Sequence, residues 1–121
     1  MPITDYCFQD RIFFAKETGT ITAEDAQEWS KKLVEAAQTS PEPIVALVDA
    51  TTIGSLSSAA ARIFERASYT ENLLAVVVAT HAAAALTSRT IGLLGKRGGT
   101  IVLATLDAAR EQAELLLREA E

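Results

Sequence analysis

The stretch Ile44-Val45-Ala46-Leu47-Val48 contains five apolar residues in succession, without a polar residue among them. A strand with one face in water alternates apolar and polar residues, whereas a strand that is covered on both faces does not. Two more segments have this character, at 73–79 and, after Thr100, at 101–104. The three runs therefore predict neighbouring parallel strands in a sheet with helices on both faces.

Helical patterns precede, separate and follow the three runs. Thr22 is a good N-cap, and Glu24 and Asp25 place negative charge in the first turn of the helix that it opens. The inward positions of that helix are Ala26, Trp29, Leu33 and Ala36. A second helix carries the stripe Ala60, Ile63, Phe64 and Ala67, an alanine-rich helix is expected over 82–94, and Thr105 caps the last one. Each helix thus has one apolar side to place on the sheet.

The N-terminal segment predicts a hairpin. The segments 6–8 and 12–16 are rich in aromatic and β-branched residues, with the turn expected at 9–11 and a break at Gly19. The predicted order is ββαβαβαβα. The fold class is therefore α/β, a single domain over 1–121 with a mostly parallel sheet, an antiparallel edge hairpin and flanking helices.

Composition narrows the functional class. The chain has 121 residues and a net charge of −5, so it lacks the basic surface that nucleic-acid binding requires. Its apolar runs are far shorter than the roughly 20 residues of a membrane-spanning helix, and the start shows no signal-peptide pattern. Cys7 is the single cysteine and is expected in the core; with no partner for a disulfide it fits a reducing cytoplasm.

Three segments carry a resemblance to a known family. These are Gly19 to Asp25 with Trp29 one turn later, the strand end Val48-Asp49, and the helix start Thr105 to Ala109. In them the chain resembles the STAS-like group of small bacterial proteins, which is similar to the sporulation anti-sigma-factor antagonist (SpoIIAA-like) and to the lipid-binding SEC14 fold. The resemblance implies a regulatory or binding role without catalysis.

The resemblance also implies a place for regulation. Phosphorylated antagonists carry an Asp-Ser pair where a helix begins after the central strand. Aligned on Asp49, this pair falls at Ser57 and Ser58, with Ser57 standing in the position of the acid. These two serines are the candidate phosphorylation sites.

Polar residues are expected to gather where the parallel strands end, because ligands bind beyond the carboxyl ends of strands in open α/β sheets. Asp49 to Gly54 is expected to be a polar loop on this edge. The candidate ligand or partner surface consists of Asp49, Thr51, Thr52, Ser55, Ser57, Ser58, His81 and Arg89.

Several kinds of chemistry are open at this edge. Asp49, Ser57 or Ser58, and His81 are the residue types of a hydrolytic triad, but the glycine-serine-glycine elbow is absent. Exposed hydroxyls at a helix N-terminus can bind or carry a phosphate, but simple capping of the helix by one of the serines is the favoured explanation. Residues 95–99 suit a helix C-cap better than a phosphate loop. No metal-ligand spacing is present, and no cofactor is expected.

The leading interpretation is a non-enzymatic regulatory or protein-binding module in the cytoplasm, acting through 49–58 and the helix that follows. A carrier of a small apolar ligand or lipid is the alternative, because the alanine-rich helix leaves room for a guest. A small hydrolase is the third interpretation. A symmetric homodimer is expected in each case.

Overall fold

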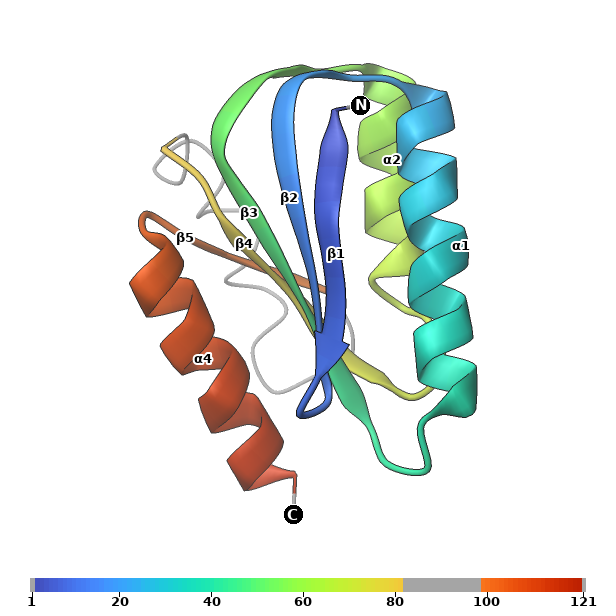
Figure 1. Cartoon of the computed structure of the whole chain (residues 1–121), viewed down its shortest axis with the longest axis vertical. Helices are drawn as coiled ribbons and strands as arrows, with labels where there is room; N and C mark the ends of the chain where they lie inside the picture. Colours follow the sequence, from blue (N-terminus) through green and yellow to red (C-terminus); the bar gives the residue numbers. More distant parts are fainter. Residues whose placement is uncertain (1, 82–98, 121) are drawn as a thin grey trace.

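The structure, a computed structural model, describes residues 2–81 and 99–120 (Figure 1). The helix predicted over 82–94, Arg89 and most of the cap predicted at 95–99 lie outside the described residues. In chain order, the elements are β1 (Ile3–Gln9), β2 (Ile12–Ile21), α1 (Ala23–Thr39), β3 (Ile44–Leu56), α2 (Ser58–Ala67), β4 (Leu73–Ala79), β5 (Thr100–Leu103) and α4 (Leu106–Glu119).

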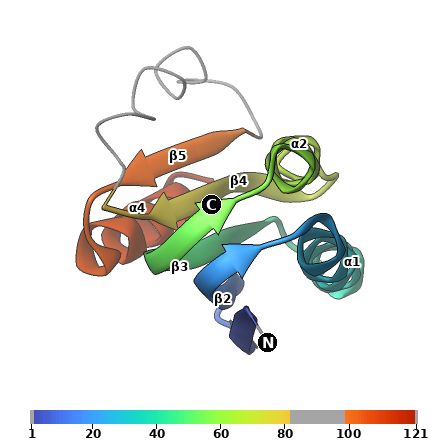
Figure 2. The ribbon, with the colours of Figure 1, turned by 90° about the horizontal axis from the view of Figure 1, so that it is seen from above.

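The strands form one sheet in the order β1-β2-β3-β4-β5. β1 pairs antiparallel with β2, and β2 through β5 run parallel. This confirms the predicted α/β class and the parallel arrangement of the three apolar runs. Figure 2 shows α1 and α2 on one face of the sheet and α4 on the other. Both faces of β3 and β4 are thus covered, which is why their sequences do not alternate.

Two separate cores result from this layering. Under α1 and α2, Trp29 is fully buried between Phe13 of β2 and Phe64 of α2, with ring centroids 6.4 Å and 4.6 Å away. Under α4, Ala109, Ala113 and Leu117 pack on a second cluster that is centred on β3 and β4. The predicted inward stripes of α1 and α2 are confirmed.

The first residues of the helices are capped by the side chains that the sequence predicts. Thr22 and Asp25 form a reciprocal capping box, and Thr105 accepts a hydrogen bond from the amide of Ala108. Ser57 is the serine that caps α2, since its hydroxyl accepts from the amide of Ala60 at 3.0 Å. Each cap satisfies a backbone N–H that has no partner within its helix.

The hairpin is tighter than predicted. Gln9 pairs with Ile12, so the turn contains only Asp10 and Arg11, with φ values of 54° and 64°. Positive φ at both central residues is the mark of a type I′ turn, whose twist matches that of the flanking strands. Asp10 tolerates this conformation well, whereas arginine is an uncommon choice for it.

Two predicted boundaries are wrong. β2 does not break at Gly19 but continues to Ile21, and 49–54 is not a loop but the carboxyl half of the 13-residue strand β3. Pairs from Thr18↔Thr52 to Ile21↔Leu56 join the two extensions. Gly19 adopts a φ of 63° without ending the strand. A Cβ on Gly54 would lie 3.3 Å from the carbonyl oxygen of Gly19, so a glycine permits this close approach.

Asn72 fixes the start of β4 against the end of α1. Its side-chain nitrogen, Nδ2, donates to the backbone carbonyl oxygens of Ala37, Ser40 and Glu42 at 2.9–3.2 Å. Its own carbonyl accepts from the amide of Ile44 at 2.9 Å, and its φ is 69°. One side chain therefore ties the α1–β3 connection to β4.

We predict that Asn72→Ala lowers the free energy of unfolding by about 2–3 kcal/mol, because the amide bonds are lost and alanine is strained at positive φ. Asn72→Gly loses the same bonds without that strain, so its loss is about 1–2 kcal/mol. Urea unfolding measures both. Wild-type stability in both variants would contradict this role for the amide.

Candidate functional site

The parallel strands do not all end at the same level of the sheet. Asp49 on β3 pairs with Ala79 on β4, which pairs with Leu103 on β5, and there β4 and β5 end. β3 continues to Leu56 beside β2. The predicted edge is thus divided into two places: a near edge at the level of Asp49 and a distal tip at the end of β3.

The near edge brings together Asp49, Thr51, Thr80 and His81. Asp49 is 8% exposed, and its Oδ1 accepts from the amide of Thr51 at 3.1 Å and from the hydroxyl of Thr51 at 2.6 Å. The amide of Thr80 donates to the carbonyl of Leu103, and His81 follows as an exposed residue. The carboxylate of Asp49 is therefore engaged in a local turn-like contact rather than directed at a histidine.

The distal tip holds the other predicted residues. The hydroxyl of Ser55 donates to that of Thr20 at 3.1 Å, and Ser57 is the N-cap of α2. Ser58 is the exposed first residue of that helix. Thr52 lies between the two places, where its hydroxyl donates to the carbonyl of Glu17 at 3.4 Å.

This arrangement bears on the hydrolytic alternative. Extended chain advances about 3.3 Å per residue, so the eight residues from Asp49 to Ser57 span roughly 26 Å along the chain. Asp49 and His81 share the near edge, but Ser57 and Ser58 do not join them. The structure does not assemble a serine triad from these residues.

Comparison with known proteins supports the fold. No family model matches the chain, and none of the curated proteins matches it. A crystal structure of an uncharacterized protein of the DUF3478 family from Shewanella loihica PV-4, described as having a SpoIIAA-like fold, superposes with a TM-score of 0.64. The match covers 92% of this chain and 93% of that one, at 20% sequence identity.

The fold is SpoIIAA-like. This confirms the resemblance drawn from the residues around Thr22, Asp49 and Thr105. At 20% identity the match supports the SpoIIAA-like architecture and no shared activity.

Within this SpoIIAA-like fold, the described residues line two open surface clefts. One, of about 410 Å³, lies between the β1–β2 hairpin and α4. The other, of about 530 Å³, lies along α4. The first is lined by Cys7, Gln9, Asp10, Arg11, Ile12, Phe14, Arg110, Glu114 and Leu117. None of α1, α2 and α4 has the length and apolar character needed to cross a membrane.

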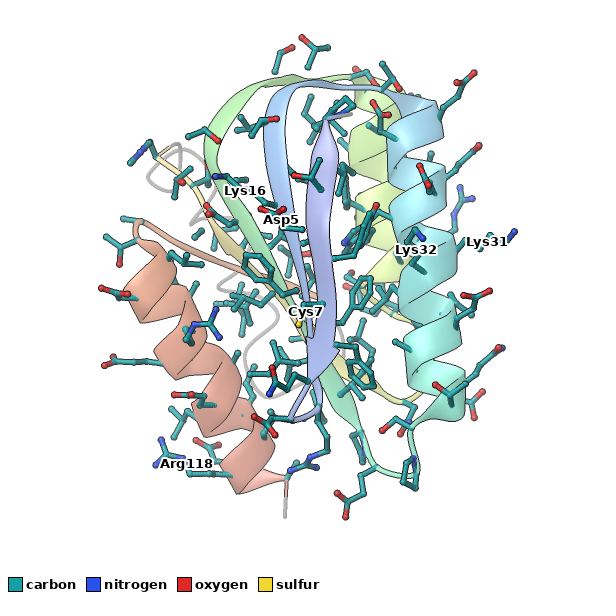
Figure 3. The ribbon with its side chains drawn as sticks, viewed as in Figure 1. Asp5, Cys7, Lys16, Lys31, Lys32 and Arg118 are labelled. Carbon is teal, nitrogen blue, oxygen red and sulfur yellow. The ribbon has the colours of Figure 1, made fainter. Side chains whose placement is uncertain are left out.

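The prediction that Cys7 is a core residue is wrong. Cys7 pairs with Phe14 and lies on the same face of the sheet as α4. Because α4 packs on β3, β4 and β5, it leaves the β1 end of that face uncovered, and Cys7 is exposed there. Figure 3 shows Cys7 on β1, with Asp5 and Lys16 above it, toward the N-terminal end of β1. The sequence predicts that β1 is a strand, but it does not indicate how much of the sheet α4 covers.

The sequence analysis missed Glu17. This residue of β2 is 3% exposed, on the face that also carries Phe13 and Ala15. Burial raises the pKa of its carboxyl from 4.5 to about 7. Alternation along β2 was the signal that could have found it, because residues 13, 15 and 17 share one face of a strand.

We predict that this carboxyl makes stability depend on pH. Since its folded-state pKa is raised, the protonated acid favours folding below about pH 4.5. As pH rises to about 7, this contribution to the free energy of unfolding is lost, and it stays lost at higher pH. The total loss is about 3 kcal/mol. Glu17→Gln removes this titration, so the variant is more stable than the wild type at pH 8 and similar to it at pH 5.

Urea unfolding at pH 5, 6, 7 and 8 measures the effect. Glu35→Gln, on the exposed side of α1, is the matched control and retains the wild-type pH profile. A Glu17→Gln profile parallel to that of the wild type would refute the assignment.

Proposed function

We propose that this protein is a non-enzymatic, protein-binding module whose partner docks on the outer side of α2. We define the α2 surface as Leu56, Ser58, Arg62, Arg66 and Tyr69. All five are exposed, and Leu56 and Tyr69 remain 42% and 55% exposed despite their apolar character. This exposed row is the observation that carries the proposal.

Helix geometry supports a continuous surface. Residues 58, 62, 66 and 69 recur at intervals of four and three, so they share one side of α2 and of the turn that follows it. The opposite side has Ala60 and Ala67 buried and Phe64 against Trp29, which fixes α2 to α1 and to the core below them. Tyrosine and arginine are the residue types that most often contribute large binding energies in protein interfaces.

Charge favours an acidic partner. The chain carries −5 overall, yet Arg62 and Arg66 give the α2 surface a local positive charge, with Glu65 beside them. The first turn of α2 contains no acidic residue, whereas α1 has Glu24 and Asp25 there. The positive end of the α2 dipole is therefore not neutralised by its own side chains.

Ser58 gives the surface a means of control, which the resemblance also implies. A phosphate on this exposed hydroxyl adds about −1.5 to −2 charges at the start of α2, four residues before Arg62. It would pair with that arginine and repel an acidic partner. Ser57 suits this role less well, because its hydroxyl already caps the helix.

The test is photo-crosslinking in cells that make the protein. A photoreactive phenylalanine analogue at Tyr69 is expected to capture a partner, and the same analogue at Leu115 on α4, which is 40% exposed, is the control. In titrations with the captured partner, Arg62→Glu with Arg66→Glu weakens binding about tenfold or more, as loss of two charge contacts does.

Arg118→Glu, on α4, is the matched charge reversal and leaves affinity within about twofold, because it lies outside the proposed surface. Ser58→Asp is expected to weaken binding and Ser58→Ala to preserve it. Equal binding by the Arg62 and Arg66 double variant and the wild type would overturn the α2 surface.

The carrier alternative predicts a different result. Native mass spectrometry of freshly purified protein would then show bound small molecules, whereas the binding-module proposal expects a mass that polypeptide chains account for, with no added ligand. The same spectrum reports whether the chain is the homodimer that we propose. The proposed location is the cytoplasm, where the exposed thiol of Cys7 stays reduced.

A further inference from the structure

β1 is held to the sheet by two separate ladders. Ile3 and Thr4 pair with Glu17 and Lys16, and the register then shifts before Cys7 pairs with Phe14. Asp5 and Tyr6 therefore oppose the single residue Ala15, and Asp5 has a φ of 58°. This is a β-bulge, where one strand bends and its pairing is interrupted. The ladder before the bulge contains only two pairs.

Three buried polar atoms lie on the α1 side of this bulge. They are the hydroxyl of Tyr6, Oε2 of Glu17 and Nε1 of Trp29, and none has a hydrogen-bond partner among the residues that the structure describes. They come from β1, β2 and α1. The Tyr6 ring packs on Phe13 at 6.0 Å, and Phe13 packs on Trp29. Unsatisfied polar atoms in a core are costly, so this is a weak point of the packing.

Among the residues that the structure describes, Glu17 forms no salt bridge. On β3, the core residues of this face are apolar, Val48 and Ala50 among them. On α1, the ammonium of Lys32 lies over the Tyr6 ring, 5.0 Å from its centroid. Burial, and to a smaller extent the charges of Glu28, Glu17 and Asp25, raises the pKa of Tyr6 to about 12. An ionised Glu17 therefore adds to the negative charge that acts on Tyr6.

We propose that ionisation of Glu17 releases the first part of β1, residues 2–6, which pivots at the Asp5–Tyr6 bulge and uncovers the edge of β2. The segment that moves is held by the two-pair ladder, the buried side chain of Ile3 and the packing of the Tyr6 ring on Phe13. The Thr18 amide also donates to the Pro2 carbonyl at 2.8 Å. The hairpin end, from Cys7 to the turn, stays paired. The device is independent of the α2 surface.

Burial explains why the release responds near neutral pH. The carboxyl is uncharged below a pKa of about 7 and charged above it. The charged carboxylate is hydrated only when residues 2–6 detach from β2. The population of this open state therefore increases as pH rises. Between pH 6 and pH 8 the linkage amounts to about a tenfold change in the opening equilibrium.

Amide hydrogen exchange of the intact chain, corrected for the intrinsic rate, tests the proposal. The amide of Thr18 is the direct reporter, since its acceptor is Pro2. Its protection is expected to fall about tenfold from pH 6 to pH 8. It should also be insensitive to low concentrations of urea, because a local opening exposes little surface.

Glu17→Gln and Glu17→Met are both expected to remove the pH response of Thr18, and Glu35→Gln to retain it. Either neutral variant suffices if the other does not fold. The proposal is overturned if Thr18 protection does not change with pH in the wild type, or if it changes equally in the neutral variants. It is also overturned if urea accelerates Thr18 exchange as strongly as that of the Val77 amide in β4, because release would then require global unfolding.

Discussion

The pairing of β2 with β3 along almost their whole lengths is the constraint on which the rest of the structure depends. The two strands stay paired from Ile12 and Val45 to Ile21 and Leu56. The amide of Ser57 then donates to the carbonyl of Ile21 at 3.2 Å, so α1 and α2 begin next to each other (Figure 1). Because this ladder runs past the ends of β4 and β5, it separates the near edge from the distal tip, and with them Asp49 from the serines.

Local signals were sufficient for much of this fold. The buried runs predicted parallel strands, because a strand covered on both faces has no polar period. Caps at Thr22 and Thr105 act within one helical turn, so sequence alone locates them. The extension of β2 and β3 was missed because Gly19 and 49–54 have turn-like composition. Pairing between residues more than 30 positions apart decides their structure, although threonine and isoleucine in these segments favour strands.

The candidate site was predicted less well, and the reasons are physical. The prediction placed Asp49 to Ser58 on one edge because it assumed that parallel strands end at the same level. The longer β3 instead separates Asp49 from the serines. The prediction placed Cys7 inside because it could not measure how much of the sheet α4 covers. Glu17 escaped notice since a lone carboxylate in a strand is normally solvated. Its burial costs stability at neutral pH, and such costs are often retained where they serve a function.

Backbone contacts seen by nuclear magnetic resonance test the central claim most directly. If β2 and β3 are paired through their extensions, nuclear Overhauser effects will connect the backbones of Thr18 with Thr52, Gly19 with Ile53, and Ile21 with Leu56, and the bonded amides will exchange slowly. Absence of these contacts, together with fast exchange across 50–56, would show a loop instead. The serines would then be free to approach Asp49 and His81, and the division of the edge would be contradicted.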